Sequence, residues 1–220
     1  MPNFDLRNCN CMDLMREYPD KHFELAIVDP PYGIGESLKK REHNSTVKWK
    51  NPPKKKHVQK SWDLYKPNKL FFNELFRVSK EQIIWGANYY PEHLSGSMGW
   101  IFWDKKNGDS DFSDGELAYT SFRKGLRKFE WLWNGFQKQK PEARIHPTQK
   151  PVALYKWLLH NYAKQGDKIL DTHLGSGSIA IACHQMGFDL TGSELDKDYF
   201  EAMQKRIKEE TKQQDLFSIA

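Results

Sequence analysis

The sequence contains few cysteines and no long apolar run. Its only cysteines are Cys9, Cys11 and Cys183, too few for the disulfide framework of a small secreted domain. Cys9 and Cys11 have no second pair at metal-ligand spacing, so we expect no zinc site. No stretch of 18 apolar residues is present, and the first residues lack the basic-then-apolar order of a signal peptide. We therefore expect a soluble, cytoplasmic protein that does not bind membranes.

The chain also lacks internal repeats, and its 220 residues suit one sizeable α/β core or two small domains. The net charge of +5 is unevenly distributed, because residues 36–69 contain 11 Lys/Arg and 3 Asp/Glu, a local balance of +8. A solvated loop and a contact with the phosphate backbone of nucleic acid are both consistent with this composition. Trp49 and Trp62 in the same segment suit either base stacking or anchoring of the loop.

Two groups of basic residues are candidates for nucleic-acid contact. The first lies in the segment 36–69 and comprises Lys39, Lys40, Arg41, Lys48, Lys54, Lys55 and Lys56. The second comprises Arg123, Arg127 and Lys128, together with the nearby Trp131 and Trp133. By contrast, three tryptophans fall in apolar runs and are expected in the core: Trp85, Trp100 and Trp103.

Apolar periodicity predicts an alternation of strands and helices. The expected strands are 4–8, 23–28, 81–88, 99–104, 115–122, 167–171 and 189–194. The expected helices are 11–19, 69–79, 151–162, a turn and helix at 175–187, and 196–212. Residues 104–113 and 123–144 are predicted to be irregular. The alternation predicts a parallel, doubly wound Rossmann-like α/β sheet.

A glycine turn points to a nucleoside-bearing cofactor. Gly175-Ser176-Gly177-Ser178-Ile179-Ala180 fits the pattern G-x-G-x-x-A between an expected strand and helix. Glu194 follows at the end of the next strand. Such glycines allow a ligand to approach the backbone closely, and an acid in this place accepts hydrogen bonds from a ribose diol. The pattern alone leaves open whether the cofactor is a dinucleotide or S-adenosylmethionine.

The apolar run Leu25–Val28 ends at Asp29-Pro30-Pro31-Tyr32, which suits chemistry on an exocyclic amino group. The lone pair of such an amino group is conjugated with its ring, so the nitrogen is a poor nucleophile. The Asp29 carboxylate and the Pro30 carbonyl could accept its two N–H bonds and free the lone pair, while the prolines hold both acceptors stiffly. Tyr32 would stack on a base taken out of the helix.

Four motifs in this order resemble the amino-group DNA methyltransferases. They are "DPPY" at 29–32, "HPTQKP" at 146–151, "ILDTHLGSGS" at 169–178 and "LTGSELDKDYF" at 190–200. With the catalytic motif first and the cofactor motif last, the order is similar to the circularly permuted β class. "IIWGANYY" at 83–90 and the unusual "DTHLGSGS" look most like small adenine methyltransferases of phages and prophages.

The resemblance implies an S-adenosylmethionine-dependent DNA N6-adenine methyltransferase, bacterial or phage-encoded and of the type found in restriction-modification systems. Asp29, Pro30, Pro31 and Tyr32 would be catalytic. The implied cofactor residues are Asn10, Asp29, Thr148, Gln149, Lys150, Asp171, Thr172, His173, Gly175, Ser176, Gly177, Ser178 and Glu194. We expect a single domain over 1–220, with 36–69 as a basic DNA-contact insert and 104–145 as a target-recognition region on double-stranded DNA.

Two positions depart from the family pattern, and other functions stay open. Asn10 stands where relatives usually have an aspartate, and Thr172-His173 where many have Pro-Phe. The alternatives are a cytosine N4 or RNA methyltransferase, and a DNA-binding module with a decayed cofactor site. Asp at the first position of the elbow favours adenine, because cytosine enzymes of this group more often have Ser there.

The C-terminal segment carries a separate hypothesis about a protein partner. Gln213, Leu216 and Phe217 resemble the short peptides with which bacterial DNA enzymes bind the replication sliding clamp, although they could equally pack on the core of this chain. The sequence leaves open whether the protein forms a homodimer.

Overall fold

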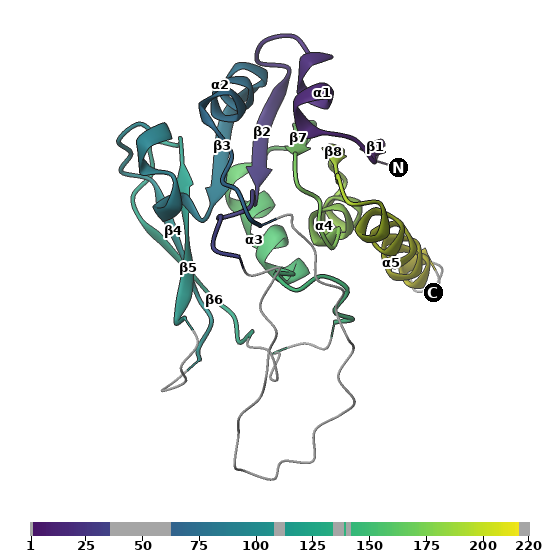
Figure 1. Cartoon of the computed structure of the whole chain (residues 1–220). Helices are drawn as coiled ribbons and strands as arrows, with labels where there is room; N and C mark the ends of the chain where they lie inside the picture. The colour runs from purple at the N-terminus through teal and green to yellow at the C-terminus, as the bar shows by residue number, and fades with distance from the viewer. Residues whose placement is uncertain (1, 36–62, 108–112, 134–138, 140–141, 216–220) are drawn as a thin grey trace. The chain divides into compact units, whose positions relative to one another are not determined.

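The computed structural model describes residues 2–35, 63–107, 113–133, 139 and 142–215, and contains one large mixed sheet flanked by helices (Figure 1). The strands are β1 (Phe4–Arg7), β2 (Phe23–Val28), β3 (Ser79–Trp85), β4 (Trp100–Asp104), β5 (Gly115–Thr120), β6 (Arg127–Glu130), β7 (Lys168–Asp171) and β8 (Asp189–Ser193). The helices are α1 (Cys11–Arg16), α2 (Lys69–Val78), α3 (Val152–Tyr162), α4 (Ser178–Met186) and α5 (Lys197–Asp215). Short 3₁₀ helices lie at Ala87–Tyr89 and Pro91–His93.

The strand order in the sheet is β1-β8-β7-β2-β3-β5-β4-β6. The strands from β1 to β3 are parallel, as the alternation predicts. The doubly wound, Rossmann-like fold is thus confirmed, but the sheet is not wholly parallel. Strand β5 runs antiparallel to both of its neighbours in the sheet, β3 and β4.

Strand β6 corrects the prediction that residues 123–144 are irregular. Arg127–Glu130 pairs in parallel with β4 at the edge of the sheet. Only Phe129 of its four residues is buried, and the other three are exposed. A charged edge strand with one inward apolar residue lacks the apolar run that marks a buried strand.

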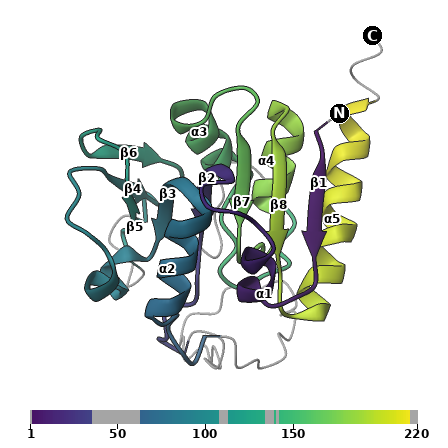
Figure 2. The same cartoon turned by 90° about the horizontal axis from the view of Figure 1, so that it is seen from above.

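Helices cover both faces of the sheet (Figure 2). Helices α1 and α2 contact each other on one face, and α3, α4 and α5 form a continuous series on the other. The core between them contains the inward residues of the strands, including Ile27, Ile83 and Trp85, together with Leu158 and Ile179 of the helices. Both faces of the central strands are therefore buried, which explains their continuous apolar runs.

The helix ends match the predicted signals. The carboxylate of Asp196 accepts hydrogen bonds from the backbone N–H of Asp198 and Tyr199 at 3.0 and 3.1 Å, which makes it the N-cap of α5. Pro151 directly precedes α3 in extended conformation, and Gly187 ends α4 with a φ of 75°.

The described chain divides into two compact units, one comprising Met1–Pro30 and Pro67–Ala220, the other Pro31–Lys66. The boundary after Pro30 falls inside the Asp29–Tyr32 elbow. Most of the segment 36–69 lies outside the described residues, so its role as a DNA-contact insert stays a prediction. Among the described residues, no helix is long and apolar enough to span a membrane.

Candidate active site

Four predicted site residues follow the carboxyl ends of four strands that are consecutive in the sheet. Asn10, Glu194, Asp171 and Asp29 come at or shortly after the ends of β1, β8, β7 and β2, respectively. Ligands of doubly wound sheets bind at this edge. The fold therefore brings together residues that are up to 184 positions apart in the chain.

The glycine turn between β7 and α4 has the conformation that its sequence predicts. Gly175 and Gly177 have φ angles of +49° and +71°, in the left-handed region. A Cβ on Gly177 would lie 2.4 Å from a side-chain carbon of Met203, so glycine also allows α4 to pack closely against α5. The turn thus leaves backbone accessible at the start of α4, where a cofactor can approach.

Glu194 is fixed by two backbone hydrogen bonds. Its Oε2 accepts from the N–H of Gly175 at 2.9 Å and its Oε1 from the N–H of Asp196, also at 2.9 Å. The carboxylate thereby joins the end of β8 to the glycine turn. Asn10 is the N-cap of α1, and its Oδ1 accepts from the N–H of Met12 at 2.8 Å.

Asp171, the last residue of β7, has a strongly perturbed carboxyl group. Burial raises its pKa, and the neighbouring carboxylates Asp29 and Glu194 add to the rise, which brings it to about 8. A hydrogen bond from the N–H of His173 at 2.9 Å opposes this rise only in part. A cation that binds beside such a carboxyl stabilises its ionised form.

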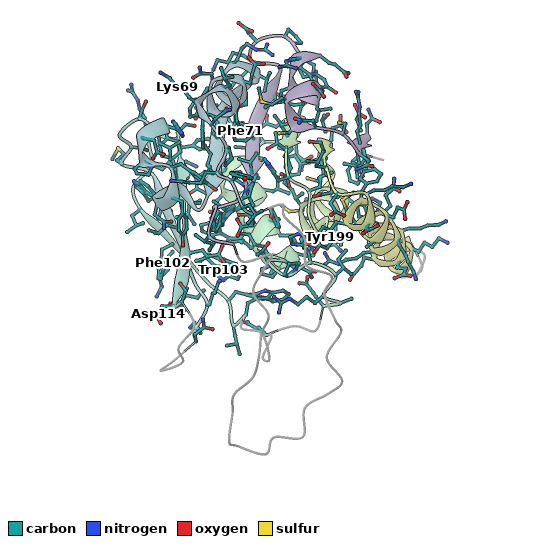
Figure 3. All side chains as sticks on the ribbon, viewed as in Figure 1. Lys69, Phe71, Phe102, Trp103, Asp114 and Tyr199 are labelled. Atoms are coloured by element: carbon teal, nitrogen blue, oxygen red, sulfur yellow. The ribbon has the colours of Figure 1, made fainter. Side chains whose placement is uncertain are left out.

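Thr172 and His173, which stand where many relatives have Pro-Phe, contact each other. The Oγ1 of Thr172 lies 2.9 Å from Nδ1 of His173, and burial lowers the pKa of His173 to about 4. The His173 ring meets Phe71 of α2 edge to face, with centroids 5.5 Å apart; Figure 3 labels Phe71. His173 is thus a neutral, packed side chain. Among the described residues, no group of three His, Cys, Asp or Glu is arranged to bind a metal ion.

Arg206 of α5 forms hydrogen bonds with the second half of the glycine turn. Its Nη1 donates to the Ser176 carbonyl and to Oγ of Ser178, both at 2.9 Å. Its Nη2 forms a buried ion pair with Glu142 at 2.9 Å. Glu142 in turn accepts from the N–H of Val152, the first residue of α3, at 3.2 Å. Arg206 therefore ties the cofactor turn to the segment that carries "HPTQKP".

Asp29 begins a chain of alternating charges that extends across the sheet. Its Oδ2 lies 2.5 Å from Nζ of Lys150, which also contacts Oε2 of Glu116 on β5 at 2.9 Å. The other oxygen of Glu116 contacts Lys105, which follows β4, at 2.5 Å. Lys150 and Lys105 also lie over the rings of Trp85 and Trp103, at 5.4 and 5.0 Å. These four ionised groups make a neutral cluster.

The pKa values show that this cluster stays ionised. Burial alone would lower the pKa of Lys150, but Asp29 and Glu116 outweigh it and raise the pKa above its ordinary value. Burial alone would raise the pKa of Glu116, but Lys150 and Lys105 bring it to about 2. Lys150 and Glu116, the two central groups of the cluster, are therefore both charged at neutral pH.

The Pro30 carbonyl, the other predicted acceptor, also has a buried donor. The hydroxyl of Tyr90, a fully buried side chain, donates to the Pro30 oxygen at 2.9 Å. A carbonyl oxygen has two lone pairs, so this bond orients the group without using its whole acceptor capacity. Asp29 and Pro30 are thus each fixed by a side chain from a distant part of the sequence.

The second half of the elbow belongs to the smaller unit, where a buried aspartate organises it. Oδ1 of Asp63 accepts from the N–H groups of Tyr32 and Gly33 at 2.8 and 3.0 Å. The Asp63 carbonyl accepts from the N–H of Gly35 at 3.1 Å. Pro31 precedes this turn. The roles of Pro31 and Tyr32 toward a base stay predictions.

Within "HPTQKP", the predicted cofactor residues Thr148 and Gln149 contact their own segment. Oγ1 of Thr148 lies 3.1 Å from Nδ1 of His146, whose ring meets Tyr199 of α5 at 4.3 Å between centroids (Tyr199 is labelled in Figure 3). The Gln149 amide bonds to the Ile145 N–H and to the Ala143 carbonyl, at 3.0 and 2.9 Å. These contacts shape the loop before α3.

The predicted nucleic-acid residues divide into described and undescribed ones. Lys39, Lys40, Arg41, Lys48, Lys54, Lys55 and Lys56 lie outside the described residues, as do Leu216, Phe217 and the side chain of Gln213. Arg123, Arg127 and Lys128 are exposed. Lys128 forms ion pairs with Glu130 and, at 3.3 Å, with Asp104, so part of its charge is locally balanced.

The prediction that Trp133 faces DNA is wrong, whereas that for Trp131 stays a prediction. Trp133 belongs to the core, and its Nε1 donates to the Gln149 carbonyl at 2.9 Å. Trp131 is partly buried and lies parallel to Phe129, with ring centroids 6.1 Å apart. Both tryptophans follow β6 in the chain and contact the core. Trp85 and Trp103 are buried as predicted, whereas Trp100 is half-buried.

Sequence reasoning assigned no role to the residues that hold the acceptors and the cofactor turn, namely Tyr90, Lys105, Glu116, Glu142 and Arg206. A signal existed for Glu116 alone, as an acid near the start of an otherwise apolar strand. The others are single polar residues whose partners are distant in the sequence, and no spacing rule connects them.

Comparison with known proteins supports a family assignment. Residues 49–205 match the N6/N4 methyltransferase family model, described as DNA methylase. The chain is 23% identical to the Type II methyltransferase M.HpaI of Haemophilus parainfluenzae, over 91% of this chain and 73% of that protein. It is also 23% identical to the Type II methyltransferase M2.MboI of Moraxella bovis, over 95% and 89% respectively. A shorter match of 34% identity covers 56% of this chain and 47% of M2.DpnII of Streptococcus pneumoniae.

Solved structures share the fold. The complex of M1.HpyAVI with SAM superposes with a TM-score of 0.58 at 20% identity, over 92% of this chain and 99% of that one. The PvuII DNA methyltransferase, described as cytosine-N4-specific, gives a TM-score of 0.60 at 9% identity, over 96% and 91%. At these identities the similarity establishes the architecture alone.

Proposed function

Because the chain belongs to the N6/N4 DNA methylase family, we propose that it transfers a methyl group from S-adenosylmethionine to the N6 amino group of adenine in double-stranded DNA. The observation that supports this most directly is the pair of acceptors at the end of β2. The Asp29 carboxylate and the Pro30 carbonyl are adjacent, and each is fixed by a buried donor, Lys150 and Tyr90.

The described residues fit the proposed cofactor. Asp171 is a buried carboxyl whose raised pKa favours the arrival of a positive group, and S-adenosylmethionine carries a sulfonium and an ammonium. The glycine turn offers accessible backbone, and Glu194 stands at the end of the neighbouring strand for the ribose. When bound, the cofactor supplies an electrophilic methyl group whose leaving atom becomes a neutral thioether.

The chain contributes positioning and electrostatics to this reaction. Asp29 and Pro30 would accept the two N–H bonds of the amino group and so free its lone pair for the methyl group that the cofactor supplies. As the N–C bond forms, the nitrogen becomes positive, and it then loses one N–H proton through Asp29 to solvent. Tyr32 holds the ring of a base extruded from the duplex.

Adenine is proposed over cytosine because Asp29 occupies the first position of the elbow, where cytosine enzymes of the resembled group more often have Ser. The proposed DNA surface includes Arg123 and Arg127, which are exposed. The sliding-clamp contact of the C-terminal segment is a separate proposal, tested by whether deletion of residues 213–220 abolishes clamp pull-down while methylation continues.

The proposed function is tested by transfer of a labelled methyl group from S-adenosylmethionine to duplex DNA, followed by digestion to nucleosides. We expect label in N6-methyladenine. Asp29→Ala should abolish transfer while cofactor binding, measured by calorimetry, is retained. Absence of transfer to duplex DNA, single strands and RNA would contradict the proposal, and label in N4-methylcytosine would contradict its adenine specificity.

A further inference from the structure

Lys150 is more deeply buried than either carboxylate that it contacts. Its side chain is 2% exposed, against 16% for Asp29 and 23% for Glu116. It reaches the two carboxylates from the start of α3, whereas Asp29 follows β2 and Glu116 belongs to β5. Lys150 therefore connects three separate elements at the edge of the sheet that carries the proposed acceptors.

We propose that Lys150 is a positioning residue that fixes the orientation of the Asp29 carboxylate for the target amino group, and that Glu116 controls this orientation by holding Lys150 from the opposite side. The inference rests on the proposed function, since it concerns the acceptor that the reaction needs. It also assigns a role to Glu116, which lies two strands away from Asp29 in the sheet.

The geometry explains why Lys150 needs a second anion. An ammonium group has three donors on a flexible stem of four carbons, so one carboxylate alone leaves its position poorly fixed. Glu116 holds Nζ at 2.9 Å, and Lys105 holds Glu116 at 2.5 Å. Without Glu116, the position of the ammonium group beside Asp29, and with it the orientation of the Asp29 carboxylate, would be poorly fixed.

The expectation that Lys150 binds the cofactor stays a prediction, and the positioning role is distinct from it. Nζ of Lys150 contacts carboxylates on β5 and after β2. The glycine turn is instead held by Glu194 and Arg206. The two roles predict different kinetics, because a cofactor ligand affects the cofactor Kd, whereas a positioning residue for the acceptor affects kcat.

The first experiment compares Glu116→Gln with the matched control Glu24→Gln. Glu24 is also a partly buried carboxylate with a lysine partner, Lys80 at 3.0 Å, but it lies near the opposite end of β2. We expect Glu116→Gln to lower kcat by about 10²-fold, as displaced catalytic groups do. The cofactor Kd should stay within about twofold, and the control should keep both values. An unchanged kcat, or a rise in cofactor Kd that accounts for the loss, would overturn the inference.

A second variant separates positioning from charge balance and from loss of folding. Glu116→Gln combined with Lys105→Met removes one charge of each sign and leaves the cluster neutral. The inference predicts that kcat stays low in this double variant, because Lys150 still lacks its holder. Recovery of the kcat of the unaltered protein would overturn it. Thermal unfolding shows whether each variant is folded at the assay temperature, and a loss of kcat that merely follows the unfolded fraction counts against the inference.

The pH dependence of kcat provides a further test, because a purely structural role of Glu116 would leave it unchanged. Besides Lys150, the cluster contains the ionisable groups of Asp29, Glu116 and Lys105. The ionisable groups of Asp171 and Tyr155 lie near it. Glu116 is one of the two groups that raise the pKa of Lys150. Its loss should therefore shift the alkaline limb of kcat to lower pH, and an unshifted limb contradicts the role of Lys150.

The two proposals fail in distinguishable ways. If Asp29→Ala retains methyl transfer, Asp29 is not the acceptor and the proposed function fails whatever Glu116 does. If Asp29→Ala abolishes transfer while Glu116→Gln leaves kcat and its pH profile unchanged, only the positioning role of Lys150 fails.

Discussion

Asp29 and Asp171 stand at the ends of neighbouring strands, β2 and β7, yet the protein treats their carboxyl groups in opposite ways. Asp29 contacts a buried ammonium group that is shared with a second carboxylate. Asp171 is deeply buried beside like charges, and its pKa rises to about 8. The proposed role of Asp29 as a hydrogen-bond acceptor requires an ionised carboxylate before substrate arrives. A cationic ligand, by contrast, can induce the ionisation of Asp171.

The supports of the two sides differ in the same way. The side of Asp29 depends on side-chain charges from β5 and from the residues after β4. The side of Asp171 depends on Glu194 and Arg206, whose side chains hydrogen-bond to backbone groups of the glycine turn. Changes in side-chain charge should therefore affect kcat through the first side and cofactor affinity through the second.

Of the changes that test this comparison, Arg206→Met, on the side of Asp171 and the glycine turn, should have the largest effect on stability. It leaves Glu142, a buried carboxylate, without its guanidinium partner and removes the donor to Ser176. We expect a loss of about 3–5 kcal/mol in the free energy of unfolding. The cofactor Kd should rise as well, while kcat at saturating cofactor changes little. The exposed Arg16→Met is the control, and a selective loss of kcat would break the comparison.

A smaller effect, opposite in sign, is expected for Asp171→Asn. The folded protein holds a proton on Asp171 up to a pH of about 8, whereas the unfolded chain releases it near 3.8. Folding therefore becomes less favourable as pH rises between these values, and Asn removes that loss. Urea unfolding at pH 8 should show the variant more stable by at least about 1 kcal/mol.

Two further measurements sharpen this prediction. The stability difference should shrink toward pH 4, and the exposed Asp13→Asn should show no such trend. Because a cationic cofactor favours the ionised carboxylate, its affinity for the unaltered protein should rise with pH up to about 8, with proton release on binding. Equal stability of Asp171→Asn and the unaltered protein at pH 8 would mean that Asp171 is already ionised in the folded protein, and would contradict the prediction.

The smallest effect is expected for Tyr90→Phe on the side of Asp29. The change removes one buried hydrogen bond to the Pro30 carbonyl, worth about 1 kcal/mol. We expect kcat to fall by several-fold, with unchanged cofactor affinity. Tyr18→Phe, which removes a hydroxyl that donates to Asp5 at 3.0 Å, provides the control. A larger effect on cofactor Kd than on kcat would contradict the division of the two sides.

The sequence predicted the elements whose own residues determine them. Apolar runs located the central strands, and Gly175 and Gly177 located the turn into α4. Strand β6 was missed, because Phe129 is the single buried residue among charged ones. Trp133 was misplaced because Arg123, Arg127 and Lys128, five to ten positions earlier, suggested a basic surface. Its burial depends instead on the core that it joins.

The candidate site was predicted to the same extent. Asp29, Asp171 and Glu194 were found because strand-end acids follow a pattern that one segment carries. Glu116, Lys105 and Tyr90 were not predicted, because their importance comes from contacts with residues 11, 34 and 60 positions away. A pairing of this kind becomes visible only when the order of the strands in the sheet is known.

The pairing of β1 with β8 has a consequence for synthesis of the protein. Leu6 lies opposite Gly192, so β1 cannot pair with β8 until 186 further residues have been synthesised. At about 5–20 residues per second, this delay is roughly 10–40 s. Completion of the sheet, and with it the edge where Asn10, Glu194, Asp171 and Asp29 meet, therefore requires synthesis of the chain as far as β8. During that interval the apolar strand β2 has yet to pair with β7.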